Sequence, residues 1–359
     1  MSINIYAFYN NKGGVGKTTL CSQAAALYAN KHPETQVLVI DLCPQANISQ
    51  FLLGGGKKGY ENNQLLQSRQ SRKNIVGFVD WLLQGNSRFT TLNTSYKVPV
   101  YRFNPYISKN VYLIAGDSFL ESFSLALNYA VLNPANINVW REFMTAIKRL
   151  CELEFNKKDY QKMVVFIDCN PSFSIYTQMA LVSANQLIIP MTADYSSLEG
   201  IKGLFMLLFG KYPSAALEKY ATNTITFNKQ IINFNLQLPH IYEFVFNNFT
   251  IKEGIATAYN SIKHDLVEFC YQQFQSFPHC FTSSSYSNAM LIDDWERLYC
   301  SNIKDFHTSG RVSSSLGIPM FLLPEQSKYT MPDGEEVQLP LKNYQKALDD
   351  IFYFVDKLS

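Results

Sequence analysis

The segment YNNKGGVGKTTL (residues 9–20) has the composition of a loop that binds phosphate groups. It follows a short apolar run rich in β-forming residues (3–10), which predicts a buried parallel strand. An alanine- and leucine-rich stretch that predicts a helix (18–30) comes directly after it. Glycines let the backbone curl so that several N–H groups point at one anion, and the helix N-terminus adds its dipole. In such a loop Lys17 reaches the β- and γ-phosphates of a nucleotide, and the Thr18 hydroxyl ligates Mg²⁺.

This loop departs from the ordinary phosphate-loop pattern GxxxxGK[ST] at two positions. The pattern requires glycine at position 11, where this chain has Asn11, and the chain adds a second lysine at Lys12. A glycine-rich turn with incidental lysines is the alternative interpretation. The strand expected before the loop and the helix expected after it favour the phosphate loop.

Further apolar runs of strand length recur along the chain and alternate with helical stretches. They are residues 36–42, 161–170, 185–193, 241–249 and 317–325. Strands that alternate with helices imply βαβ units. The sequence therefore predicts an α/β fold with a mostly parallel, doubly wound sheet.

The composition is that of a globular protein with a large core. Hydrophobic residues make up 47% of the 359 residues and charged residues 17%, and the net charge is +2. This balance argues against a strongly basic surface for binding nucleic acid, although a local basic patch is compatible with it.

The seven cysteines include no CxxC pair, which favours reduced thiols. No signal peptide is recognisable, and no apolar run approaches the roughly 18 residues needed to span a membrane, so we expect a cytoplasmic protein without a membrane partner.

Two polar segments fit the alternating pattern poorly, and we interpret them as insertions in a single domain that spans residues 1–359. The first (54–75) is glycine-rich and carries five basic residues against one acidic residue. The second (219–239) is rich in asparagine.

The C-terminal stretch 341–359 has apolar residues at helical spacing with balanced lysines and aspartates. It predicts a closing helix packed on the sheet, not a membrane-targeting tail.

The segment KGGVGKTT resembles the deviant Walker A motif of the ParA/MinD group of P-loop ATPases. The closer resemblance is to ParA/Soj partition ATPases, because VLVIDLCPQAN (37–47) and the block 164–201 match that family's later segments in order and length. Together these blocks cover about a third of the chain. The segment 110–123 weakly resembles the one that lies between them in the family, and the two insertions have no recognised counterpart.

The resemblance implies a set of site residues. Lys12 is similar to the signature lysine that crosses to the partner's phosphates in an ATP-sandwiched dimer, and Lys17 and Asp41 complete the implied catalytic set. Asp168 resembles the Walker B aspartate, so the implied Mg²⁺ site comprises Thr18, Asp41 and Asp168. Asn247 and Pro324 fall where the family contacts or lines the adenine, although Asn247 is also compatible with a simple turn. The implied nucleotide-binding residues are Lys12, Gly13, Gly14, Val15, Gly16, Lys17, Thr18, Thr19, Asn247 and Pro324.

Cys43 departs from the family pattern, which has a second aspartate at this position, thought to orient the attacking water. A thiol is mostly neutral near pH 7 and is a weak hydrogen-bonding group. Losing such a positioning group lowers a rate by roughly 10²–10⁴-fold. Three interpretations follow, in order of preference: slow hydrolysis, rescue by Asp41 or a partner protein, and a redox-sensitive thiol, which would require a lowered thiol pKa.

The resemblance implies an ATP-dependent homodimer that binds DNA without sequence preference and responds to a cargo-bound adaptor. The basic residues between positions 57 and 73 are the candidate DNA contacts, and a solvated surface loop is the equal alternative. A different class of function is a nearly non-hydrolysing, ATP-gated regulatory subunit of a mobile-element or defence system. An iron–sulfur reductase is disfavoured because the cysteines do not suggest a bridging cluster.

Overall fold

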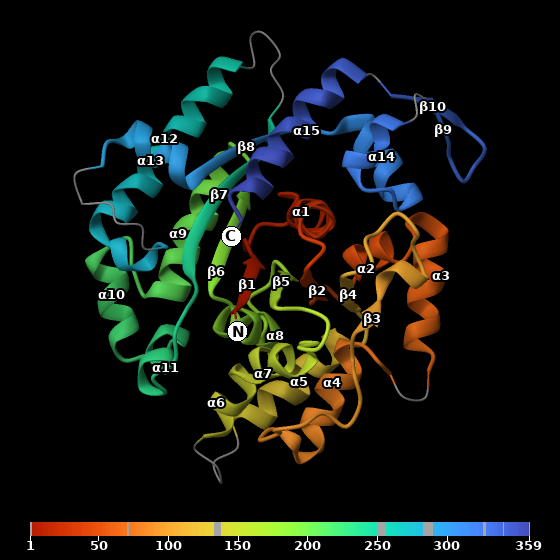
Figure 1. The fold of residues 1–359 in the computed structure, drawn as a ribbon. Helices are drawn as coiled ribbons and strands as arrows, with labels where there is room; N and C mark the ends of the chain where they lie inside the picture. Colours follow the sequence, from red (N-terminus) through yellow and green to blue (C-terminus); the bar gives the residue numbers. More distant parts are fainter. Residues whose placement is uncertain are drawn as a thin grey trace.

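The computed structural model describes residues 2–69, 72–132, 138–249, 256–282, 290–325, 328–339 and 341–358. An eight-stranded sheet forms its centre, with the strand order β3-β4-β2-β5-β1-β6-β7-β8 (Figure 1). Every neighbouring pair is parallel except β3 and β4, which confirms the predicted fold class. The strands are β1 (Ser2–Phe8), β2 (Thr35–Asp41), β3 (Val98–Pro99), β4 (Val111–Ile114), β5 (Lys162–Asp168), β6 (Gln186–Met191), β7 (His240–Phe249) and β8 (Cys300–Lys304).

Helices cover both faces of this sheet and bury two separate apolar clusters. Along β1, Tyr6 and Phe8 point into one cluster, while Ile5 and Ala7 point into the other, as the two-residue period of a strand requires. The first face carries α1 (Lys17–Lys31), α2 (Asn47–Leu52), α3 (Gly56–Gln67), α14 (His307–Leu316) and α15 (Leu341–Asp356). The second carries α4 (Ile75–Trp81), α5 (Leu120–Val131), α6 (Val139–Met144), α7 (Ala146–Glu154), α8 (Ile175–Ser183), α9 (Tyr195–Phe209), α11 (Phe227–Asn233), α12 (Ala256–Ser276) and α13 (Ile292–Tyr299). A short hairpin of β9 (Lys328–Thr330) and β10 (Glu336–Gln338) lies outside the sheet.

The predicted strand at 317–325 is wrong. Residues Met320–Glu325 form a 3₁₀ helix, and the edge strand is instead β8, which precedes that segment. Gly317 has a left-handed backbone (φ 66°) that ends α14, and Pro319 and Pro324 lack the N–H groups that a strand ladder needs. The sequence of β8, CSNIK, is too short and polar to stand out by composition.

The segment 54–75 forms a helix, α3, for most of its length. Gly54, Gly55 and Gly56 all have positive φ, which turns the chain sharply between α2 and α3. A Cβ on Gly55 would lie 2.1 Å from the backbone nitrogen of Gly317, so this turn packs directly against the end of α14. The structure therefore gives this basic segment a helical scaffold, and its status as an insertion stays a prediction.

The second polar segment folds as α10 (Ala215–Thr222) and α11, between α9 and β7. The predicted C-terminal helix is confirmed as α15, which packs against α1 and forms the Lys31–Asp356 ion pair with it. Within the described part of the chain, no helix is both long enough and apolar enough to cross a membrane.

Candidate phosphate-binding site

The loop between β1 and α1 curls around its own glycines at the carboxyl end of the central strand. Gly14 (φ 75°) and Gly16 (φ 83°) have left-handed backbones, and Gly16 is the N-cap residue of α1. The side chain of Asn247, from the end of β7, lies directly against Gly16 and donates a hydrogen bond of 3.2 Å to the carbonyl of Val15. A loop of this shape directs backbone N–H groups and a helix N-terminus at an anion.

Lys17 and Thr18, the first two residues of α1, lie beside the acidic end of β5. Lys17 is buried, and its Nζ donates a hydrogen bond of 2.8 Å to the carbonyl of Lys12 across the loop. Burial lowers the pKa of Lys17, an effect that Asp168 opposes. The Thr18 hydroxyl donates to Oδ2 of Asp168 at 2.8 Å. The structure therefore brings together the lysine, hydroxyl and carboxylate that the sequence predicted for a Mg²⁺-nucleotide site.

Asp41, at the end of β2, is fully buried and is held by its own following segment. Its Oδ1 accepts from the backbone N–H of Cys43 at 2.9 Å, and its Oδ2 accepts from the backbone and the hydroxyl of Ser49 at 3.1 and 2.6 Å. Gly116 approaches closely from the end of β4, since a Cβ there would lie 2.7 Å from the Asp41 carboxyl. These contacts fix the carboxyl group beside Asp168.

The carboxyl groups of Asp41 and Asp168 and the thiol of Cys43 offer ligand atoms within 4.8 Å of one another. Burial raises the pKa of Asp168 to about 8, and the charge of Asp41 adds to this effect. Burial also raises the pKa of Asp41 to about 6. Burial and then the two carboxylates raise the pKa of Cys43 well above its ordinary value. These effects oppose the lowered thiol pKa that the redox interpretation requires, and only the charge of Lys17 acts in the other direction.

These residues fit a hard divalent cation. Oδ1 of Asp168 is buried and has no hydrogen-bond partner among the described residues, while Oδ2 already faces the Thr18 hydroxyl. Two buried carboxyl groups that repel each other need a neighbouring positive charge. Carboxylate and hydroxyl oxygens are ligands that Mg²⁺ accepts, usually together with water and nucleotide phosphates. Asp168 and Thr18 are the residues that would hold the ion, with Asp41 close by.

Lys12 points back onto its own chain. Its Nζ forms an ion pair with Asp194, which caps α9, and also donates to the hydroxyls of Thr192 (3.0 Å) and Ser197 (3.4 Å). Partial burial acts to raise the pKa of Asp194, but hydrogen bonds from Lys12, Thr192 and Ser196 together lower it well below its usual range. The expectation that Lys12 crosses to a partner stays a prediction, and such a crossing would have to break this ion pair.

The other predicted residues divide into two groups. Thr19 lies in the first turn of α1, and Gly13 lies in the loop with open space around it. Pro324 lies in the 3₁₀ helix Met320–Glu325, whose first N–H donates to Gln23 on α1 at 2.7 Å. The surroundings of the Pro324 side chain lie outside the described part of the structure. Its role at the base stays a prediction.

Sequence reasoning missed several residues that shape this site. They are Asn10, Ser49, Thr192, Asp194 and Ser197. Asn10 is fully buried, accepts from the N–H of Lys12 and donates to the carbonyl of Pro190, which ties the loop to β6. Asp194 had a recognisable signal, because an aspartate at the start of a helical stretch (DYSSLEG, 194–200) is typical of a helix N-cap.

Comparison with known proteins identifies the class. Residues 3–209, more than half of the chain, match the family model described as AAA domain, so the chain belongs to this family. Within it the chain is ParA/Soj-like. It is 26% identical over 246 residues to the chromosome partitioning protein ParA of Myxococcus xanthus, covering 68% of this chain and 65% of that protein. It is also 26% identical over 200 residues to the sporulation initiation inhibitor protein Soj of Bacillus subtilis, covering 56% and 62%.

An uncharacterised protein of Pseudomonas putida is 28% identical over 216 residues. That match covers 56% of this chain and 60% of the relative, so the chain spans about three fifths of the length of such relatives. Among solved structures, pnob8 ParA is similar with a TM-score of 0.57 and 16% identity over 99% of this chain and 96% of that one. Apo McdA of Cyanothece is similar with a TM-score of 0.51 and 14% identity over 96% and 99%. At these identities the structural likeness shows the fold alone.

Proposed function

We propose that this chain is a Mg²⁺-ATP-binding molecular switch of the ParA type that dimerises with ATP and hydrolyses it slowly. The observation that carries the proposal is the meeting of Lys17, Thr18 and Asp168 beneath a glycine loop that opens a helix. The backbone N–H groups of that loop and the N-terminus of α1 suit the phosphates. The lysine supplies positive charge, and the Thr18–Asp168 pair suits the metal ion.

The proposed dimerisation rests on the similarity of Lys12 to the signature lysine of ParA-type ATPases. A cation one residue before the glycines adds charge where phosphoryl transfer develops it. In this chain the lysine is held by Asp194, Thr192 and Ser197, so its side chain must turn away from the start of α9 to reach a partner's nucleotide. Asn247 lies against Gly16, which supports its predicted place near the base.

The proposed slow rate of hydrolysis rests on Cys43. The thiol lies beside both carboxyl groups, and its raised pKa keeps it neutral. A neutral thiol accepts hydrogen bonds poorly and orients an attacking water weakly. Asp41 is one of the two carboxyl groups beside Cys43, but three hydrogen bonds from Cys43 and Ser49 already occupy it.

A role in DNA partition or cargo positioning is the setting that the relatives suggest, since two of them carry the names Chromosome-partitioning ATPase Soj and Chromosome partitioning protein ParA. Non-specific DNA and a cargo-bound adaptor are then the expected partners. Cys43 favours a second candidate, a nearly non-hydrolysing ATP-gated regulatory subunit. The two differ in whether bound ATP turns over.

Equilibrium binding of Mg²⁺-ATP and the mass of the complex would test this proposal. We expect the wild type to bind Mg²⁺-ATP and to double its mass in light scattering, and Lys17→Ala to lose most of its affinity. Asp168→Asn should lose the Mg²⁺ dependence of binding while keeping its fold by circular dichroism. Equal ATP affinity in the wild type and Lys17→Ala would contradict the proposal. Single-turnover hydrolysis in the same samples separates the two candidates.

A further inference from the structure

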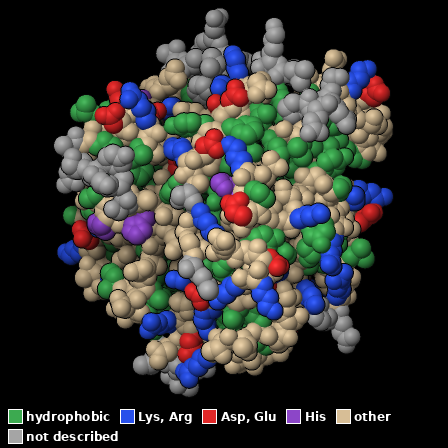
Figure 2. All heavy atoms as spheres, in the orientation of Figure 1, with side chains coloured by type: hydrophobic (Ala, Val, Ile, Leu, Met, Phe, Trp, Pro, Cys, Tyr) green, Lys and Arg blue, Asp and Glu red, His purple; other side chains and the backbone are tan. Residues whose placement is uncertain are grey.

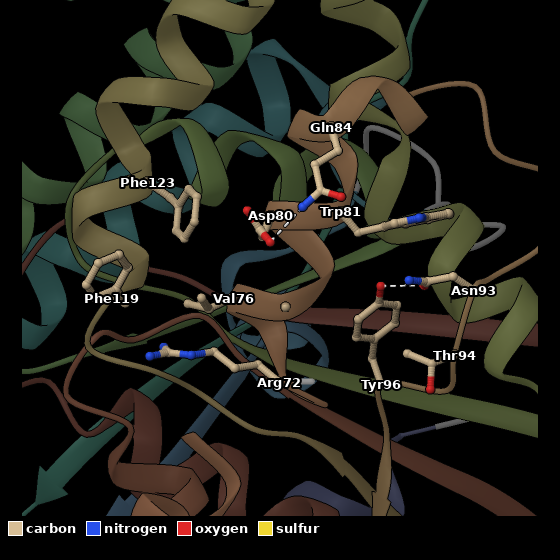
Figure 3. A pocket seen from close by; sticks show the side chains of 11 residues that line it. Arg72, Val76, Asp80, Trp81, Gln84, Asn93, Thr94, Tyr96, Phe119 and Phe123 are labelled. Atoms are coloured by element: carbon tan, nitrogen blue, oxygen red, sulfur yellow. Dashed lines mark hydrogen bonds between the residues drawn. The ribbon is translucent and has the colours of Figure 1, made fainter. Parts of the chain in front are cut away.

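A surface groove runs along α4 (Figure 3), and none of its lining residues belongs to the phosphate loop. Its volume is about 380 Å³, within the range of roughly 300–1,000 Å³ that ligand sites occupy. Gly77 also lines it, and a Cβ at this position would lie 1.8 Å from the carbonyl oxygen of Arg72, so the segment before α4 packs closely on the helix. Phe119 and Phe123, from the start of α5, lie on one side of Asp80 and Gln84, and Trp81, Asn93 and Tyr96 lie on the other.

The groove has one uncompensated charge, and it is negative. The guanidinium of Arg72 is paired with the buried carboxyl of Asp117 at 2.7 Å and lies over the ring of Phe119. Asp80 is exposed, and its carboxylate accepts a hydrogen bond of 3.0 Å from the amide of Gln84. No lysine or arginine of the described residues forms an ion pair with Asp80. Arg72 is therefore neutralised, whereas Asp80 is open to an incoming cation.

Aromatic rings surround this carboxylate. Phe119 is 52% exposed, and Phe123 and Trp81 are partly buried. Aromatic faces attract cations, and each such contact contributes about 0.5–1 kcal/mol at an exposed site. The same rings bury aliphatic side chains well. The groove disfavours an anionic ligand, because the carboxylate of Asp80 would repel it and the guanidinium of Arg72 is already paired with Asp117.

We propose that the groove between α4, α5 and residues 93–96 is a docking site for a basic, extended segment of a partner protein, with an arginine or lysine side chain placed on Asp80. The basic side chain lies between the rings and Asp80, and a neighbouring aliphatic residue covers Val76 and Gly77. This site is separate from the phosphate loop, and its occupation does not require ATP.

Hydrogen bonds connect the groove to the nucleotide site. Asp117 holds both Arg72 and Asn74, and Asn74 caps the first turn of α4. The preceding residue, Gly116, donates its N–H to the Ser49 hydroxyl at 2.8 Å, and this hydroxyl donates to Asp41. The groove and the candidate catalytic carboxyl therefore share one segment, residues 115–117.

The test uses the full chain labelled with 5-fluorotryptophan, whose Trp81 resonance is assigned with Trp81→Phe. The probes are acetyl-Ala-Leu-Arg-Leu-Ala-amide and the same peptide with glutamate in place of arginine, added without nucleotide. We expect the arginine peptide to shift the Trp81 resonance saturably and to leave those of Trp140 and Trp295 unchanged. The glutamate peptide should produce no shift.

Asp80→Asn keeps the shape of the side chain and removes its charge, and we expect it to weaken arginine-peptide binding about three- to tenfold. Asp349→Asn on α15 is a matched control, because Asp349 is also exposed and accepts from a glutamine one helical turn away at 3.0 Å. That variant should bind the peptide like the wild type. Equal shifts with both peptides, unchanged affinity in Asp80→Asn, or no Trp81 shift at 10 mM peptide would overturn the proposal. Because no nucleotide is present, failure here leaves the ATP-binding experiment unaffected.

Discussion

Cys43 lies beside two buried carboxyl groups, at the position where the resemblance to ParA/Soj ATPases implies a second aspartate. The residue is close enough to Asp168 and Asp41 to share a metal-sized space with them, yet its thiol supplies no charge. Under the proposed function, Asp41 and Asp168 serve Mg²⁺-ATP binding, and Cys43 does not supply the charge that would position the attacking water. This arrangement predicts a separation of binding from turnover.

Cys43→Asp should raise the single-turnover rate of ATP hydrolysis by roughly 10²-fold or more, because a carboxylate holds a water that a neutral thiol does not. Rapid quench with excess enzyme measures this rate without interference from product release. Cys43→Ser is the control, since it keeps the size and lacks the charge, and it should stay slow. A wild type that already hydrolyses as fast as Cys43→Asp would mean that another residue positions the water.

Asp194→Asn should favour ATP-dependent dimerisation, because it removes the carboxylate that holds Lys12 on its own chain. A partly exposed ion pair contributes up to about 1 kcal/mol, so the protein concentration at half-dimerisation should fall about two- to fivefold. Analytical ultracentrifugation in Mg²⁺-ATP measures this concentration.

Glu199→Gln provides the comparison for that experiment, because Glu199 forms an ion pair with Lys202 at 2.7 Å on the same helix, α9. This change should leave dimerisation as in the wild type. If Asp194→Asn weakens dimerisation instead, then Asp194 acts in the dimer and not as a restraint on Lys12.

At the scale of single elements, the turn from β1 into α1 depends on Gly16. A Cβ at Gly16 would lie 1.7 Å from Nδ2 of Asn247, and the left-handed backbone there disfavours any side chain. Gly13, in the same loop, has open space around it and no positive φ. The backbone and the packing therefore require glycine at position 16 but not at position 13, although both glycines belong to the same motif.

Gly16→Ala should lower the free energy of unfolding by about 1–3 kcal/mol, from backbone strain and displacement of Asn247. Gly13→Ala should change it by less than about 0.5 kcal/mol. Urea denaturation monitored by circular dichroism measures both. Adding Asn247→Ala to Gly16→Ala should restore part of the loss, and no restoration would show that Asn247 does not press on this glycine.

The elements that sequence predicted well are those with a local signal. The runs at β1, β2, β5, β6 and β7 are apolar and bounded by turn residues, and α1 and α15 show clear helical composition or spacing. The prediction of a strand at 317–325 was wrong because it relied on apolar composition. It did not take into account that the two prolines in this segment lack the N–H groups a strand needs. Lys17, Thr18 and Asp168 were recognisable because each lies at a strand end or helix start. The Lys12–Asp194 ion pair was not, since its partners are 182 residues apart.

At the scale of the whole molecule, the parallel sheet separates two ends with different roles. The carboxyl ends of β1, β2 and β5 carry the phosphate loop, Asp41 and Asp168, and α3 follows from the same end of β2. Lys and Arg side chains gather on the side of the molecule where α3 lies (Figure 2). Lys57 and Lys58 are exposed at the start of α3. Lys157 and Lys158 form a second exposed lysine pair, which lies before the opposite, amino end of β5.

This contrast makes a prediction about DNA. Lys57→Gln combined with Lys58→Gln should weaken binding of the Mg²⁺-ATP form to random-sequence duplex DNA. It should also reduce the slope of log affinity against log salt by about 1.8, because each lost phosphate contact removes about 0.9. Fluorescence anisotropy from about 50 to 200 mM salt measures both. Lys157→Gln combined with Lys158→Gln removes the same charge from the other end and should leave the slope unchanged. An equal loss in both double variants would mean that net charge, and not the α3 surface, governs attraction to DNA.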